Sequence, residues 1–163
     1  MTVLEPKIIK KKSFQVIGYT FEANLQEIEA GNLCKKALTR LQETSDKILN
    51  KVGDHIYLIQ IYPMKEDFNA FKDKFTQIIA FEVSHSTDVP EGAIHHTIPE
   101  NLYAAYTHKG PEADLHKTYE YLYGKWMNEN GYKPIGYDME LWDDRYEPEN
   151  STNEIDLFIP IES

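Results

Sequence analysis

The sequence predicts an α+β protein with an antiparallel sheet, two long helices and a central pocket, built from duplicated strand–helix–strand–strand units with pseudo-twofold symmetry. Two observations support this class. Short segments rich in β-branched and aromatic residues are interspersed with two amphipathic stretches. The same order of elements also occurs twice, with a period of roughly 80 residues. One such unit has too few layers to bury its helix and sheet, so we expect two units that share a core and leave a cleft at their junction.

The 163 residues suffice for one sizeable core, and we expect a single domain over 1–163. Its first half-repeat, roughly 1–88, begins with lysines that we interpret as a solvated edge. Alternation, helical spacing and β-rich runs then predict strand, helix, strand and strand, with Gly53 stopping the helix. The expected elements are a strand at 14–19, a polar irregular segment at 22–31, a helix from 32 to about 51, and strands at 55–62 and 75–84.

The second half-repeat, roughly 89–163, shows this order again after an extended segment at 93–97. Gly110-Pro111 precedes its helix, where Pro suits the first turn, and Asn130-Gly131 follows it, where Gly suits a left-handed cap. The expected elements are a strand at 102–108, a helix at 115–130, a strand at 136–146 and a last strand at 154–161.

The strand at 136–146 has one apolar face and one face on which carboxylates neighbour an indole. Alternation places Tyr137, Met139 and Leu141 on the first face, and Asp138, Glu140 and Trp142 on the second. A carboxylate that leaves water without a partner is costly, so a strand that only closed a core would rarely carry Glu140 beside Trp142. Two interpretations stay open here: an edge strand with Glu140 in water, or the wall of a pocket.

The charge balance argues against direct binding of nucleic acid, because 17 basic residues against 27 acidic ones give a net charge of −10. From residue 138 to the end there are nine acidic residues and one base, Arg145. This favours a cationic partner, although solubility explains it equally well. The single cysteine, Cys34, fits a reducing cytoplasm, and no apolar stretch is long enough to span a membrane.

The sequence gives little support for a metal site, a nucleophilic cysteine or a phosphate-binding loop. His95 and His96 are neighbours, so a strand would send them to opposite faces, and we expect no metal site and no cofactor. Cys34 lies in an apolar helical pattern without an indicated activating base, so we interpret it as a buried core thiol. No glycine-rich phosphate loop or nucleophile elbow is present in the sequence.

Four segments together resemble the GyrI-like small-molecule-binding family, which provides the effector-binding domains of AraC-type and MerR-type multidrug regulators. They are Tyr103-Ala104-Ala105-Tyr106-Thr107-His108-Lys109-Gly110-Pro111, the helix that carries Trp126, Met139-Glu140-Leu141-Trp142, and Glu154-Ile155-Asp156-Leu157-Phe158-Ile159-Pro160-Ile161. The resemblance covers nearly the whole chain. It implies the duplicated fold predicted above, with a ligand pocket at its centre.

By this resemblance, Glu140 lies in the pocket and pairs with cationic or amphipathic aromatic compounds. The implied aromatic lining is Trp142 and Trp126, with Tyr106 and Tyr103 as further candidates. The family usually has Tyr where this chain has Trp142, which puts in doubt any role that needs a hydroxyl there. Family members act as sensor domains, as stand-alone proteins that protect gyrase from toxins, or as hydrolases that open cyclopropane-bearing alkylators. The stretch before Ser13 has no room for a helix-turn-helix module, so we expect the stand-alone form.

Binding and hydrolysis need nearly the same residues, so the sequence leaves the question of an enzyme open. A desolvated Glu140 would form a charge pair with a lipophilic cation, and the aromatic faces would add about 0.5–2 kcal/mol per contact. The same carboxylate could activate a water as general base. We expect small-molecule binding first, hydrolysis of electrophilic toxins second, and interaction with a protein such as gyrase or a regulator third.

Overall fold

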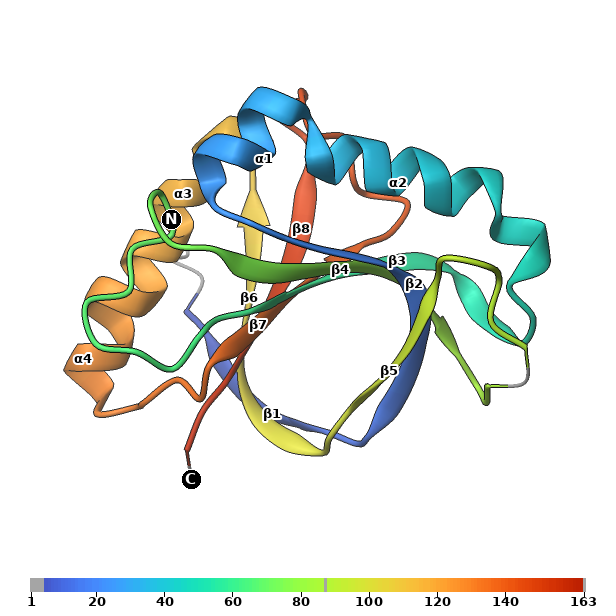
Figure 1. The fold of residues 1–163 in the computed structure, drawn as a ribbon. Coiled ribbons are helices and arrows are strands. Elements are labelled where there is room, and N and C mark those ends of the chain that lie inside the picture. Colours follow the sequence, from blue (N-terminus) through green and yellow to red (C-terminus); the bar gives the residue numbers. More distant parts are fainter. Residues whose placement is uncertain (1–4, 87, 163) are drawn as a thin grey trace.

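The computed structural model describes residues 5–86 and 88–162 and shows a curled antiparallel sheet with helices packed against it (Figure 1). The strands are β1 (Lys7–Lys11), β2 (Phe14–Ala23), β3 (Lys51–Ile61), β4 (Phe75–Val83), β5 (Ile94–Ile98), β6 (Asn101–Lys109), β7 (Tyr137–Trp142) and β8 (Glu154–Pro160). The helices are α1 (Leu25–Gly31), α2 (Leu33–Glu43), α3 (Leu115–Tyr119), the π-helical η3 (Glu120–Trp126) and α4 (Met127–Asn130), with short 3₁₀ turns η1 (Ser45–Lys47) and η2 (Glu112–Asp114).

The sheet has eight strands in the order β1-β6-β8-β7-β3-β4-β2-β5, and all neighbours are antiparallel. Three adjacent strands come from each half of the chain, and they meet where β7 pairs with β3. In that pairing Glu140 lies opposite Leu58, and Asp138 lies opposite Gln60. The predicted α+β class and antiparallel sheet are therefore confirmed.

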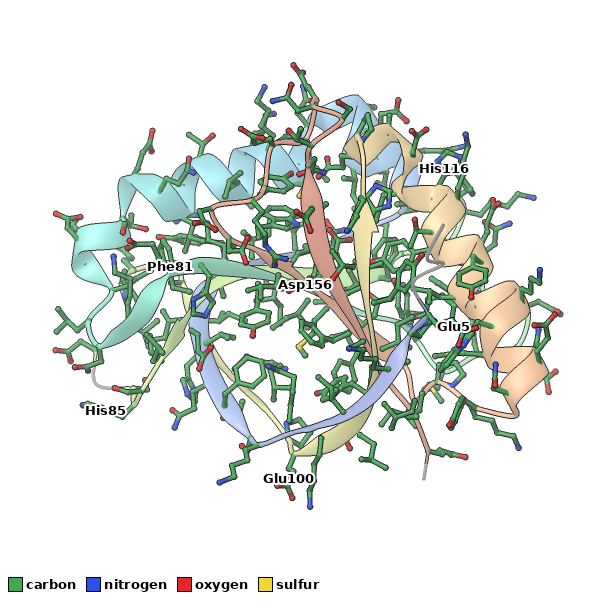
Figure 2. All side chains as sticks on the ribbon, turned by 180° about the vertical axis from the view of Figure 1, so that it is seen from behind. Glu5, Phe81, His85, Glu100, His116 and Asp156 are labelled. Carbon is green, nitrogen blue, oxygen red and sulfur yellow. The ribbon has the colours of Figure 1, made fainter. Side chains whose placement is uncertain are left out.

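Side chains pack on both faces of the sheet, in two clusters. The larger cluster lies under the helices and includes Leu41, Leu122 and Trp142. The smaller one includes Tyr57, Tyr103 and Met139 and lies inside the curl of the sheet. Figure 2 shows side chains filling the space that β1, β2, β5 and β6 enclose, with Glu100 at the turn between β5 and β6. Within the described residues, no helix is both long enough and apolar enough to cross a membrane.

The first helical region differs from its prediction at both ends. The segment expected to be irregular forms α1, because Asn24 and Glu27 close a capping box: the Asn24 side chain accepts from the Glu27 backbone N–H, and the Glu27 carboxylate accepts from that of Asn24. A left-handed Asn32 (φ 50°) then separates α1 from α2. The helix predicted to reach Lys51 ends at Glu43. Gly53 (φ 91°) lies within β3, near an irregularity in the strand, and does not stop a helix.

The second helical region matches its prediction more closely. Helical structure runs from Leu115 to Asn130, and Gly131 (φ 71°) ends it in the left-handed conformation, as expected. The strand predicted to extend to Tyr146 ends at Trp142, after which the chain forms a loop to β8. This helix and this strand together position the candidate site.

Candidate functional site

The polar face of β7 is buried under the helices. Asp138, Glu140 and Trp142 have exposed fractions of 0 %, 3 % and 5 %, and Met139 between them packs on the other face of the sheet. The predicted alternation is confirmed, and the interpretation in which Glu140 lies in water is wrong. The strand has neighbours on both sides, β8 and β3, so it is not an edge strand.

Glu140 is a buried carboxylate held by neutral donors. The Tyr119 hydroxyl donates to Oε2 at 2.7 Å, and the Trp142 indole N–H donates to Oε1 at 3.0 Å. Burial raises the pKa of Glu140 to about 8; these two hydrogen bonds act in the opposite direction, and the charges of Asp138 and Glu112 raise it further. Within the described part of the chain, no basic side chain forms an ion pair with Glu140. In its ionised form, Glu140 therefore has no positive partner among these residues.

Trp142 stacks on Tyr146 in the loop after β7, with ring centroids 4.6 Å apart and planes 7° from parallel. Both rings border a groove of about 860 Å³, which we call the Trp142 groove. Its lining comes from the two helical regions and from the loop: Ile28, Glu29, Asn32, Cys34, Lys35, Leu38, Pro111, Glu112, Ala113, Trp142, Tyr146, Pro148 and Glu149. The groove thus lies where the two halves of the chain meet, and three glutamates against one lysine make its wall acidic.

The charge of Glu140 reaches the wall of this groove. Burial, then the charges of Glu140 and Glu112, raise the pKa of the Cys34 thiol to about 12. The pKa of Tyr146 is raised as well, by burial, by its hydrogen bond to Glu112 and by the charges of Glu112 and Glu140. Cys34 packs against the larger cluster, as the core interpretation expected, but it is only half-buried because it also lies on the groove wall. Its raised pKa makes it a poor nucleophile.

The other aromatic residues expected in the pocket lie elsewhere. Trp126 stacks on Tyr132, with centroids 5.2 Å apart, in the cluster under the helices. Tyr106 packs near Tyr121 and borders a separate hollow of about 270 Å³. Tyr103 belongs to the cluster inside the curl of the sheet, where its hydroxyl pairs with that of Tyr137 at 2.8 Å. Of the five candidates, the structure brings together Glu140 and Trp142.

Three residues of the site were not identified from the sequence. Tyr119 belongs to an apolar stripe, with Leu115, Leu122 and Trp126, on the helix predicted at 115–130. Glu112 lies before that helix and Tyr146 ends the strand predicted at 136–146, and no motif marks either of them. The one available signal for Tyr119 was its polar tip in an otherwise apolar stripe, since a buried tyrosine hydroxyl usually finds a partner.

Asp138 forms a second buried acidic site on the same strand face. Its Oδ1 accepts from the Gln60 amide at 2.7 Å, and its Oδ2 accepts from the hydroxyls of Tyr62 at 2.8 Å and Tyr123 at 2.7 Å. Burial raises the pKa of Asp138 to about 6, and the three hydrogen bonds limit the rise. Tyr119 and Tyr123 stack on each other, with centroids 6.2 Å apart, and each donates to a different carboxylate.

No cluster of three or more metal-ligating side chains occurs among residues 5–86 and 88–162. The His95 ring bonds to Gln15 at 2.8 Å and is exposed, whereas His96 is half-buried. Burial and the charge of His95 lower the pKa of His96.

A family model described as the GyrI-like small molecule binding domain matches residues 4–162. The transcriptional regulator BrlR of Pseudomonas aeruginosa is 28% identical over 160 residues, which are 97% of this chain and 56% of that protein. This chain therefore spans about half the length of that relative.

Two of the solved structures that share this fold illustrate the similarity. SAV2435 bound to tetraphenylphosphonium has a TM-score of 0.74 at 13% identity, and the alignment covers 98% of this chain and 95% of that one. EcmrR, in a complex with DNA, has a TM-score of 0.74 at 17% identity, with 98% of this chain and 57% of that one covered.

Proposed function

This chain belongs to the family of GyrI-like small molecule binding domains, and on that premise we propose that it binds a hydrophobic organic cation in the Trp142 groove, with Glu140 as the counter-charge. One observation carries the proposal: Glu140 is a buried carboxylate, held by two neutral donors, directly behind an aromatic and acidic groove wall. The similarity to a protein bound to tetraphenylphosphonium, a lipophilic cation, supports the same class of ligand.

The ligand replaces a proton. With a pKa of about 8, Glu140 is mostly protonated at pH 7 while the groove is empty. A cation in the groove favours the carboxylate form and lowers this pKa, so binding releases the proton. A neutral ligand of the same shape gains none of this attraction. The site therefore selects for positive charge as well as for apolar surface.

Trp142 supplies the ring face against which the ligand packs. Tyr146 already occupies one face of the indole in a nearly parallel stack. We propose that the aromatic group of the ligand takes this position and that Tyr146, which is in a loop and not in the sheet, moves aside. The Trp142 N–H remains bonded to Glu140, so the ring that contacts the ligand also orients the carboxylate.

A binding titration with matched probes tests the role of Glu140. We expect tetraphenylphosphonium to bind Glu140→Gln at least tenfold more weakly than wild type at pH 8.5, measured by calorimetry. Neutral triphenylphosphine oxide should bind both proteins equally. Trp126→Phe serves as the background, so that quenching of Trp142 fluorescence reports the same site independently. Equal affinity of the cation for both proteins would refute the charge pairing.

Hydrolysis of electrophilic toxins is the second candidate, and the geometry supports it less. Glu140 as a general base has to be ionised, whereas burial keeps its proton at neutral pH, and each of its oxygens already accepts a hydrogen bond. Incubation with a cyclopropane-bearing alkylator, followed by mass spectrometry, separates the two candidates. Ring-opened product that disappears in Glu140→Gln would favour the hydrolase.

We also infer that the chain is one domain made of two half-repeats, roughly 1–88 and 89–163, related by a pseudo-twofold axis. The strand order supports this. Outward from the β7–β3 pairing, the second half of the chain contributes β7, β8 and β6, and the first half contributes β3, β4 and β2, so equivalent strands follow in the same order on both sides. Each half also contributes residues to the Trp142 groove. A gyrase or regulator partner, and a location in the cytoplasm, remain predictions from the sequence.

A further inference from the structure

A second groove lies beside Asp138. It encloses about 480 Å³ and shares no lining residue with the Trp142 groove. Its lining is aromatic and apolar: Tyr62, Met64, Phe68, Tyr123, Pro134, Gly136 and Tyr137. None of these side chains carries a charge at neutral pH, so any electrostatic selectivity has to come from a group behind the lining.

That group is Asp138. Its carboxylate is fully buried, and two of its three donors, the hydroxyls of Tyr62 and Tyr123, belong to residues that line this groove. Burial and the charge of Asp138 raise the pKa of both tyrosines well above the ordinary value, so both phenols stay neutral donors. A phenol that donates to a carboxylate has a more electron-rich ring, which attracts a cation to the ring face more strongly.

We propose that this groove, which we call the Tyr123 groove, binds a second organic cation that carries an apolar group, with Asp138 as its counter-charge. Charge complementarity favours this occupant, because no basic side chain in the described residues forms an ion pair with Asp138. Aromatic contact also favours it, since Tyr62 and Phe68 lie with their centroids 5.5 Å apart at the groove wall. The inference does not depend on the Trp142 groove.

Met64 offers a site-specific reporter. The chain has four methionines, at positions 1, 64, 127 and 139. Met127 and Met139 are buried in the core, whereas Met64 is 82 % exposed and lies over Gly136 at the edge of the groove. In protein labelled with ¹³C-methyl methionine, we expect the Met64 resonance to shift in a saturable way when benzyltrimethylammonium is added. Met64→Leu assigns the resonance.

Variants separate the two grooves. Asp138→Asn keeps the size of the side chain and removes the charge, so it should weaken the binding seen at Met64 at least fivefold. Phe68→Ala, which leaves the buried polar groups untouched, should weaken it similarly. Glu140→Gln should leave the Met64 titration unchanged even though it disables the Trp142 groove. A Met64 resonance that does not move, or an equal affinity for Asp138→Asn, would overturn the proposal.

The wild-type protein gives a test that does not depend on the folding of a variant. Asp138, with a pKa of about 6, is faced by Gln60, Tyr62 and Tyr123, and its acidic neighbour on the strand is Glu140. Lowering the pH from 7 to 5 should therefore weaken benzyltrimethylammonium binding several-fold and leave binding of neutral benzyl alcohol unchanged. Equal weakening of both probes would refute a charge-based site.

Discussion

Glu140 and Asp138 occupy the same face of the same strand, two residues apart, yet their surroundings raise the pKa values of the two carboxyls by different amounts. Both are buried, and both accept hydrogen bonds from neutral groups only. Asp138 has three donors and a pKa of about 6, whereas Glu140 has two donors and a pKa of about 8. The number of donors accounts for much of this difference, because hydrogen bonds to the ionised form lower the pKa. Glu140 is the less compensated charge, and so the one that gains more from an added cation.

Removing each carboxylate entirely should give the largest contrast. Asp138→Ala leaves the donors of Gln60, Tyr62 and Tyr123 without an acceptor in a fully buried place, so we expect it to destabilise the protein by about 3–5 kcal/mol. Glu140→Ala strands two donors, one of them near the groove, and removes a carboxyl whose burial is poorly compensated, so it should cost only about 1–2 kcal/mol. Urea denaturation at pH 7 measures both values. Equal losses would show that donor number does not distinguish the sites.

The pH dependence of stability should also distinguish Glu140 from Asp138. A carboxyl whose pKa is raised in the folded state holds its proton more tightly when folded, so the free energy of unfolding falls as pH rises from the unfolded pKa to the folded one. For Glu140 this window runs from about 4.5 to about 8, and for Asp138 from about 3.8 to about 6. Between pH 6 and pH 8 the decline therefore belongs mainly to Glu140.

Glu140→Gln should abolish that decline. We expect wild type to lose on the order of 2 kcal/mol between pH 6 and pH 8, and the Gln variant to stay nearly level over the same range. Asp138→Asn serves as the matched control, and its curve should still fall above pH 6. Denaturant midpoints collected at half-unit pH steps give the measurement. A decline that persists in Glu140→Gln would mean that another group titrates in this window.

The parts of this site that can be predicted from the sequence are those that depend on residues close together in the chain. The alternation along one strand was sufficient to put Asp138, Glu140 and Trp142 on one buried face, because that pattern is local. The tyrosine donors could not be predicted in this way, because they lie on another element. Tyr119 and Tyr123 lie four residues apart on a helix, about 6 Å, and this happens to match two residues on a strand, about 6.8 Å. Only the docking of helix on sheet brings them together.

Other parts of the fold show the same contrast between local signals and contacts that distant elements bring together. Tyr62 and Gln60 reach Asp138 because β3 pairs with β7 in one particular register, which the sequence of neither strand specifies. In contrast, α1 has a local signal, the Asn24 and Glu27 capping box, within a segment whose polar composition alone predicts no regular structure. Tyr146 belongs to a loop, where neither period nor cap fixes the position of a side chain.

Proton release on binding should differ between the two grooves. At pH 7 a carboxyl with a pKa of about 8 is roughly 90 % protonated, whereas one with a pKa of about 6 is roughly 10 % protonated. A cation in the Trp142 groove should therefore release close to one proton, and one in the Tyr123 groove about a tenth. Calorimetry in buffers of different ionisation enthalpy counts these protons. Glu140→Gln should remove the larger release, and a release that survives this change would contradict the assignment.

The smallest expected effect concerns Cys34, whose thiol senses only one of the two carboxylates. Burial is the main reason for its raised pKa, and the charge of Glu140 is the next cause, followed by that of Glu112. Glu140→Gln should therefore lower the pKa of Cys34 slightly and speed its alkylation by iodoacetamide at pH 9 by about two- to fourfold. Glu112→Gln should have a smaller effect in the same direction, and Asp138→Asn almost none. Mass spectrometry of timed samples gives the rates. If Asp138→Asn accelerated the reaction as much as Glu140→Gln, the charges of both carboxylates would act on the Trp142 groove, and the assignment of Glu140 as its counter-charge would fail.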